Sequence, residues 1–249
     1  MKIPAPNYNK RVVAFIDILG FENIVRSLPN NAELFNKLNW ALHRIKSIEG
    51  SKSRPNSVAA DLEVSVFSDS IVISSEEERI SSLMWTVGWL QAELMYVGIF
   101  VRGGIAVGSV VHEDGILFGE GMLSAYRLES KAAVYPRIVI SCEVFDKHKQ
   151  VLANWVEIDS DAIVYINMFK FDAVAGNADE LAADGYDPRA IYFKELRRHL
   201  MNGIETSSEE DHLAKYLWLT CRFNVAISEF NEQSIQQIEP ISGVFHTCA

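Results

Sequence analysis

The sequence has few cysteines, no long hydrophobic run and no excess of basic charge, and each shortage excludes a class of protein. The three cysteines, Cys142, Cys221 and Cys248, are scattered and form no CxxC pair, so neither a disulfide framework nor a structural zinc site is signalled. No apolar run reaches the ~20 residues that a membrane span needs. With 33 acidic and 23 basic side chains, the net charge of -10 disfavours general binding to a nucleic-acid backbone. A polyanion such as a nucleotide would have to be bound locally, through metal ions and a few placed arginines.

The chain does have the length and apolar content of a folded domain. Its 249 residues are 49% hydrophobic, which suits one large domain or a domain with an appendage. Residues 1–10 are polar, contain two prolines and lack the apolar core of a signal peptide. We therefore expect a soluble cytoplasmic protein.

Residues 12–21 (VVAFIDILGF) are the stretch around which the rest is organised. The β-branched and aromatic residues predict a buried strand, with Val13, Phe15 and Asp17 on one face. A carboxylate at the end of an apolar strand is costly unless something neutralises it. Asp17 either caps the helix that begins after Gly20 or binds a metal ion.

Residues 62–74 (LEVSVFSDSIVIS) predict a hairpin with Asp69 near its tip. Asp69 is either a turn residue, chosen for its local hydrogen bonds, or a second metal-binding carboxylate.

Residues 99–108 (IFVRGGIAVG) predict another strand. Arg102 either extends its head to solvent or binds an anion, and the two glycines after it would let another backbone approach closely. We expect a turn at residues 112–115, where His112 is either a loop residue or a metal ligand.

The order of elements up to about residue 142 is β-α-α-β-β-α-β-β-α-β, which is typical of an α+β sandwich and not of a doubly wound fold. The later residues are less informative and read as a C-terminal elaboration that packs on the core or on a partner subunit. Its expected strands cover residues 154–158 and 162–169, and its expected helices cover 188–201 and 208–230.

Four stretches in this order resemble the catalytic domain of class III nucleotidyl cyclases. They are residues 15–21 (FIDILGF), 65–69 (SVFSD), 101–108 (VRGGIAVG) and 119–130 (GEGMLSAYRLES). The resemblance implies a ferredoxin-like, palm-like βααββαβ sandwich over residues 1–142, with residues 143–249 as an α/β elaboration in a single-domain protein.

The resemblance also implies a site for two divalent cations, Mn²⁺ or Mg²⁺. Asp17 and Asp69 match the two metal-binding aspartates of the family, and the carbonyl of Ile18 would be a further ligand. Two such ions activate a ribose 3′-hydroxyl and hold a triphosphate in line for displacement.

The remaining implied roles concern phosphate. The backbone N–H groups of Leu19, Gly20 and Phe21 would hold phosphate oxygens, and Arg102 would pair with the leaving pyrophosphate. Arg127 would stabilise the transferring phosphoryl group. Because the family site lies across a head-to-tail homodimer, Arg127 would serve the metals of the partner.

The residues that read a purine in this family are absent. Ser65 and Ile116 stand at the two purine-reading positions, and Leu123 stands where an asparagine orients the ribose. This pattern, with the AYRLE run at residues 125–129, resembles the Pycsar pyrimidine cyclases of bacterial anti-phage defence.

That resemblance implies conversion of UTP to 3′,5′-cyclic UMP, which a separately encoded effector would detect. The alternatives are a cytidylate cyclase that makes cyclic CMP from CTP and an inactive nucleotide-binding regulatory module. A pure scaffold that binds no nucleotide is a third possibility.

Overall fold

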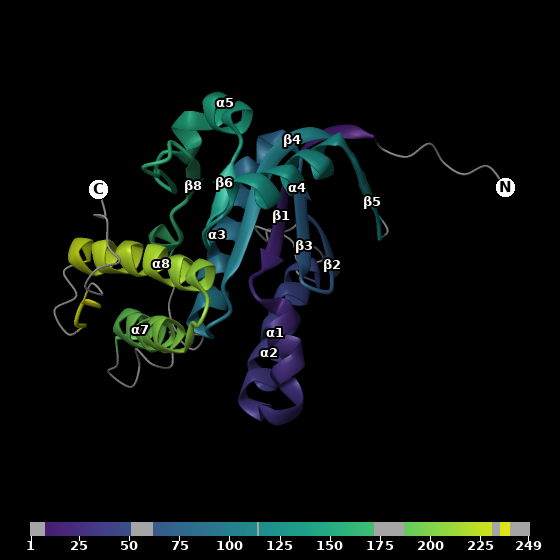
Figure 1. Ribbon diagram of the computed structural model, residues 1–249. Coiled ribbons are helices and arrows are strands. Elements are labelled where there is room, and N and C mark those ends of the chain that lie inside the picture. The colour runs from purple at the N-terminus through teal and green to yellow at the C-terminus, as the bar shows by residue number, and fades with distance from the viewer. Residues whose placement is uncertain (1–7, 51–61, 114, 172–186, 231–234, 240–249) are drawn as a thin grey trace.

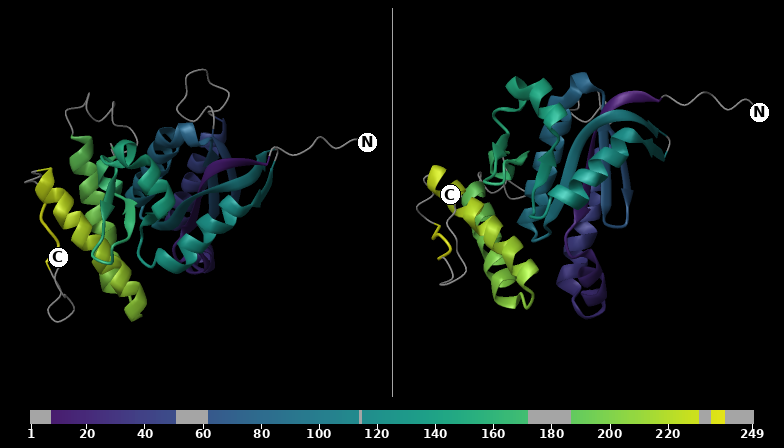
Figure 2. Two further views of the ribbon diagram at one scale, coloured as in Figure 1. Left: turned by 90° about the horizontal axis from the view of Figure 1, so that it is seen from above. Right: turned by 45° about the horizontal axis from the view of Figure 1, so that its top comes forward.

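A computed structural model describes residues 8–50, 62–113, 115–171, 187–230 and 235–239. Its centre is an eight-stranded sheet. Seven strands follow the order β2-β3-β1-β4-β6-β8-β7, and the eighth, β5, pairs with β4. Helices lie against the sheet and beyond its lower end (Figure 1), and Figure 2 shows the same arrangement from two further directions. The α+β architecture expected from the sequence is confirmed.

The order of the elements up to residue 142 is also the expected one. The strands are β1 (Asn9–Ile18), β2 (Glu63–Phe67), β3 (Ser70–Ser75), β4 (Val101–Glu113), β5 (Ile116–Gly119), β6 (Ile138–Ile140), β7 (Val156–Ile158) and β8 (Val164–Ile166). The α-helices are α1 (Phe21–Ser27), α2 (Ala32–Gly50), α3 (Ile80–Tyr96), α4 (Glu120–Ala132), α5 (Cys142–Leu152), α7 (Pro188–Thr206) and α8 (Glu210–Glu229). Short 3₁₀ helices cover Leu28–Asn30, Glu77–Arg79 and Met168–Lys170.

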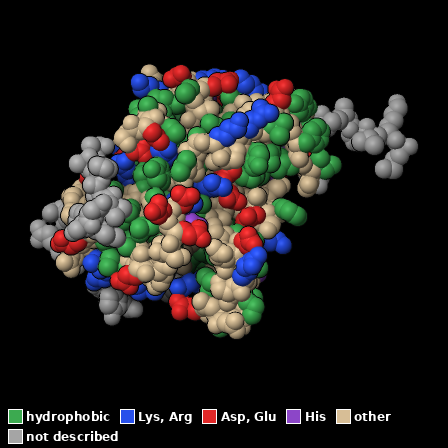
Figure 3. All heavy atoms as spheres, viewed as in Figure 1, with side chains coloured by type: hydrophobic (Ala, Val, Ile, Leu, Met, Phe, Trp, Pro, Cys, Tyr) green, Lys and Arg blue, Asp and Glu red, His purple; other side chains and the backbone are tan. Residues whose placement is uncertain are grey.

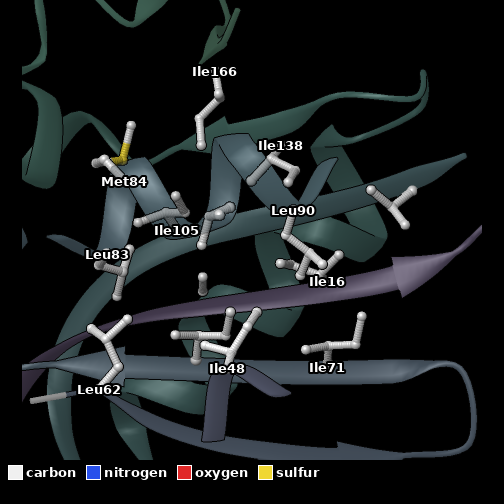
Figure 4. Packing of buried hydrophobic residues seen from close by; sticks show 14 of the residues in the cluster. Ile16, Ile48, Leu62, Ile71, Leu83, Met84, Leu90, Ile105, Ile138 and Ile166 are labelled. Carbon is white, nitrogen blue, oxygen red and sulfur yellow. The ribbon is translucent and has the colours of Figure 1, made fainter. Parts of the chain in front are cut away.

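Strand β1 lies between β3 and β4 and sends its side chains into two separate cores. Ala14 and Ile16 point into the larger core, together with residues of α2 and α3 such as Ile48 and Leu90 (Figure 4). Val13 and Phe15 point to the opposite face, which α4 covers. The two-residue period of the strand therefore sets the face on which Asp17 lies.

Helix α4 packs very close to β4 because β4 contains glycine where the two meet. A Cβ added to Gly104 would lie 2.4 Å from the carbonyl oxygen of Ala125, and one added to Gly108 would lie 2.7 Å from the backbone nitrogen of Gly121. These distances confirm that the glycines of this strand permit a close backbone approach.

Two local predictions need correction. Strand β4 continues to Glu113, so His112 lies in a strand and not in a turn. Helix α5 over Cys142–Leu152 is absent from the sequence-based reading, although Ser141 caps it by accepting a hydrogen bond from the N–H of Val144 at 3.3 Å.

The residues after 142 extend the same sheet. Strand β8 pairs with β6 through Val139 and Tyr165, and β7 pairs with β8. Helices α7 and α8 form a second core with Phe100 and Met95 from the first part of the chain.

A buried ion-pair cluster joins the two parts. The guanidinium of Arg137, which is 1% exposed, contacts Asp159 and Asp161 at 2.5 Å each. Arg222 and the indole N–H of Trp218, both on α8, also bind the Asp159 carboxylate, at 2.5 and 2.7 Å.

Two cysteines fall in the described ranges. Cys142 is free and exposed, and Cys221 is disulfide-bonded. A single disulfide leaves no CxxC-type spacing signal in a sequence.

Among the helices described, none is both long enough and apolar enough to cross a lipid bilayer.

Candidate functional site

The site is built where β1 ends beside the turn between β2 and β3. Asp17 lies opposite Ser70 of β3 and Arg102 of β4 in the strand register. The turn carries Asp69, and its preceding residue, Ser68, has a left-handed φ of 56°. The backbone N–H of Ile18 donates to the carbonyl of Asp69 at 3.1 Å, which holds this turn against the end of β1.

The carboxyl groups of Asp17 and Asp69 interact. Burial raises the pKa of Asp17, and the charge of Asp69 and a side-chain hydrogen bond to it raise this pKa further, while Arg102 opposes the shift. The two carboxylates therefore repel each other in the absence of a cation, and ionised Asp17 is held in the site at a cost.

Arg102 is held between two carboxylates. Its Nε lies 3.5 Å from Asp17 Oδ2 and 2.7 Å from Oε1 of Glu129, which projects from α4. The contact with Glu129 is an ion pair without hydrogen-bond geometry, since Oε1 has no hydrogen-bond partner in the described residues. Within those residues, neither Nη group of Arg102 donates a hydrogen bond, so both are available to an anion.

Glu129 is a part of this cluster that sequence reasoning missed. It is 3% exposed, and burial raises its pKa, with the charges of Asp17 and Asp69 acting in the same direction and Arg102 against them. Figure 3, seen from the same side as Figure 1, shows acidic and basic side chains near the middle of the molecular surface. The sequence pattern alone favours an exposed position for a glutamate in a helix that also contains other charged residues. Only the tertiary packing shows that Glu129 is buried.

The described residues include no group of three or more His, Cys, Asp or Glu side chains arranged to hold a metal ion. Asp17 and Asp69 nevertheless fit a divalent cation, because they are oxygen donors whose mutual repulsion such an ion would relieve.

The resemblance implies a phosphate cradle at the turn after β1. Gly20 has a φ of 69° and caps α1, and its carbonyl accepts from Ile24 at 3.0 Å. The N–H of Leu19 donates to Phe100 at 2.9 Å and is therefore not free. This leaves the N–H groups of Gly20 and Phe21 as the donors of the turn.

Three other expected site residues are exposed. One of them is Arg127 on α4. Leu123 on α4 is 51% exposed, and Ile116 on β5 is 55% exposed.

Ser65 lies at one end of a hydrogen-bonded chain that includes a buried histidine. His112 is 6% exposed, with Nε2 3.0 Å from Ser65 Oγ and Nδ1 2.9 Å from Ser74 Oγ. Arg11 Nε donates to the same Ser74 hydroxyl at 3.0 Å. The two-residue period of a strand over residues 101–113 is the sequence signal that could have placed His112 on the same face of the sheet as Arg102.

No protein-family model and no curated protein matches the chain. Among solved structures, adenylyl cyclase CyaB from P. aeruginosa is similar at 16% identity and a TM-score of 0.47, over 65% of this chain and 95% of that one. A bacterial light-regulated adenylyl cyclase is similar at 18% identity and a TM-score of 0.45, over 78% of this chain and 100% of that one. A third similar structure is the monomeric guanylyl cyclase domain of the RhoGC fusion protein from the aquatic fungus Blastocladiella emersonii. Its identity is 17% and its TM-score is 0.42, over 64% of this chain and 94% of that one. At these values the likeness concerns shape and says nothing of this chain's activity.

Proposed function

We propose that this protein is a metal-dependent nucleotidyl cyclase that converts UTP to 3′,5′-cyclic UMP and pyrophosphate. The observation that carries the proposal is the meeting of Asp17 and Asp69 beside Arg102 at one end of the sheet. The sequence motifs around these three residues resemble the class III cyclases, and the fold brings the three together.

Asp17 and Asp69 would hold the divalent cations, Mn²⁺ or Mg²⁺, with the carbonyl of Ile18 as a further ligand. When bound, such ions lower the pKa of a coordinated hydroxyl and neutralise charge on phosphate. In the balanced reaction the ribose 3′-oxygen forms a bond to the α-phosphorus, the bond from that phosphorus to the β-bridging oxygen breaks, and the hydroxyl proton passes to solvent. Pyrophosphate leaves with the electron pair of the broken bond.

The protein's own groups orient the phosphates. The N–H groups of Gly20 and Phe21 would bind phosphate oxygens. Arg102 would turn its free Nη groups toward the leaving pyrophosphate while Glu129 holds its Nε. A charge that is fixed in advance stabilises a transition state without reorganisation.

A second copy of the chain would complete the site. Arg127, Leu123 and Ile116 are exposed in the monomer, and Phe67, beside Asp69, is 84% exposed. Apolar side chains exposed to this extent are typical of a surface that another molecule covers. In a head-to-tail homodimer Arg127 would act on the nucleotide held by the partner's metals.

One polarity of the hydrogen-bonded chain favours uracil over cytosine, and we include that polarity in the proposal. Arg11 can only donate, so Ser74 accepts from it and keeps its own hydroxyl hydrogen, which we assign to Nδ1 of His112. In the neutral imidazole, Nε2–H then donates to Ser65, whose hydroxyl hydrogen is left to donate outward. Uracil offers a carbonyl oxygen at its O4 position, where cytosine carries an amino group that also donates.

A product assay with UTP, CTP and ATP side by side in Mn²⁺ tests the proposal. We expect cyclic UMP and pyrophosphate from UTP, and no product from the Asp69→Asn variant at equal dimer content. Cyclisation of CTP alone would make the protein a cytidylate cyclase, and cyclisation of ATP alone would overturn the pyrimidine assignment.

An inactive nucleotide-binding module is the second candidate. Leu123 at the ribose-orienting position favours it, because leucine cannot hydrogen-bond a ribose hydroxyl. It predicts that a nucleoside triphosphate with Mn²⁺ raises the melting temperature without forming product.

The anti-phage role is part of our proposal too, with a separately encoded effector that responds to the cyclic nucleotide. A phage challenge of cells with and without the Asp17→Asn allele tests it.

A further inference from the structure

A pocket lies between α1 and the turn that joins α7 to α8. Its volume is about 470 Å³, which is within the range of small-molecule sites. Leu19, Gly20 and Asn23 line one wall, and the opposite wall includes Ser208, Lys215 and Tyr216. In Figure 1 both pairs of helices, α1 with α2 and α7 with α8, lie at the lower end of the sheet. We call this cavity the C-terminal pocket.

The pocket has a cation and a hydroxyl with no partner in the described part of the chain. Lys215 is half-buried and forms no ion pair with a described residue. The ring of Tyr216 packs edge-on against Phe100 at 5.6 Å, and no described residue hydrogen-bonds its hydroxyl. Burial raises the pKa of Tyr216, so this hydroxyl keeps its proton and can donate.

One acidic side chain also lines the pocket, and it does not neutralise Lys215. The Glu209 side chain is 70% exposed, and its ion-pair partner is His212 at 3.8 Å. A lysine and a protonated phenol, both facing a pocket of this size, suit an oxyanion.

The position of the pocket identifies the anion. Leu19 and Gly20 line it and directly follow the strand that ends in Asp17 and Ile18. If the proposed function holds, on which this inference rests, the phosphate tail of the nucleotide lies at Gly20. We propose that the C-terminal pocket receives the pyrophosphate that leaves after cyclisation and that Lys215 binds it there, in addition to the contact that Arg102 makes during the reaction. The residues after 142 thereby supply one wall of the active site.

The experiment is a calorimetric titration of the whole chain with inorganic pyrophosphate and Mn²⁺. Lys215→Met removes the charge and keeps most of the side-chain length, and we expect it to raise the Kd about 10-fold, as the loss of a charge-assisted hydrogen bond does. Tyr216→Phe removes only the hydroxyl and should raise the Kd roughly 3-fold. Lys194→Met is the matched control, because Lys194 is exposed on α7 and is not a lining residue of the C-terminal pocket.

An equal Kd in the wild type, Lys215→Met and Lys194→Met would overturn the inference. Turnover separates this failure from that of the proposed function. If UTP is cyclised and Lys215→Met leaves the Kd unchanged, the pocket assignment alone is wrong. If no nucleotide is cyclised and the Kd still depends on Lys215, the pocket is confirmed as a pyrophosphate site and the reaction assignment alone is wrong.

Discussion

The backbone N–H of Ile18 donates a hydrogen bond to the backbone carbonyl of Asp69 at 3.1 Å. This bond joins the first strand to a turn some fifty residues later, immediately beside both aspartates. Because it is made by backbone atoms, it persists when either carboxylate is replaced. The two side chains can therefore be tested without loss of the geometry that brings them together.

Asp17→Asn should separate function from stability. Loss of a residue that only supports a metal ligand can lower activity by up to ~100-fold. Because we propose Asp17 as a direct ligand, we expect cyclase activity to fall by more than this. The melting temperature of the metal-free protein should not fall, because burial and Asp69 already disfavour the ionised form of Asp17. Product formation and thermal unfolding in EDTA measure the two effects, and activity within ~10-fold of the wild type would contradict the metal assignment.

The pH dependence of stability should reveal the raised pKa of Asp17. A carboxyl group whose pKa is higher in the folded state binds its proton more tightly there, so its contribution to stability falls as pH rises from 3.8 through the folded-state value. The wild type should therefore lose stability relative to Asp17→Asn over this window and regain it when Mn²⁺ is added at neutral pH. Paired chemical denaturation curves without metal measure the difference, and a constant difference across pH would refute the shift.

Glu129→Gln should release Arg102 toward Asp17. With its closer ion-pair partner neutralised, the guanidinium would compete with the cation for the Asp17 carboxylate. We expect the Mn²⁺ concentration for half-maximal activity to rise about 10-fold. Glu120→Gln, at the exposed start of the same helix, is the control. If Glu129 were only structural, the melting temperature would fall while the Mn²⁺ requirement stayed the same.

Ser65→Ala should reduce discrimination between pyrimidines. Loss of the outward hydroxyl hydrogen should lower kcat/KM for UTP about 10-fold and leave that for CTP unchanged, because only uracil accepts at that position. Competition assays with both substrates measure the ratio. Equal losses for UTP and CTP would show that Ser65 does not read the base.

Arg137→Met should be the most destabilising of these substitutions. It removes one of the two arginines that bind the buried Asp159 carboxylate and leaves Arg222 as the other, so we expect a cost at the lower end of the about 3–5 kcal/mol for breaking a buried ion pair. Asp161→Asn should cost less, because the Asp161 side chain is 43% exposed. Urea unfolding measures both, and equal losses would contradict the ranking.

Local patterns in the sequence predicted the elements that carry the site. The alternation through β1 places Asp17 on the face of Phe15, and the hairpin signal places Asp69 in a turn, because both depend on neighbouring residues alone. Contacts between distant residues left no such signal. The parallel pairing of β4 with β6 is one case, and the approach of Glu129 to Arg102 is another.

The addition of β7 and β8 to the central sheet has a consequence for truncated versions of the protein. A fragment that stops at residue 142 would present β6 as a bare sheet edge, with the backbone groups that face Tyr165 left unpaired. Arg137 would keep its charge and lose every carboxylate around it. We therefore expect residues 1–142 to aggregate when expressed alone, so a soluble fragment that carries the candidate site cannot be obtained by cutting at the end of the recognisable motifs.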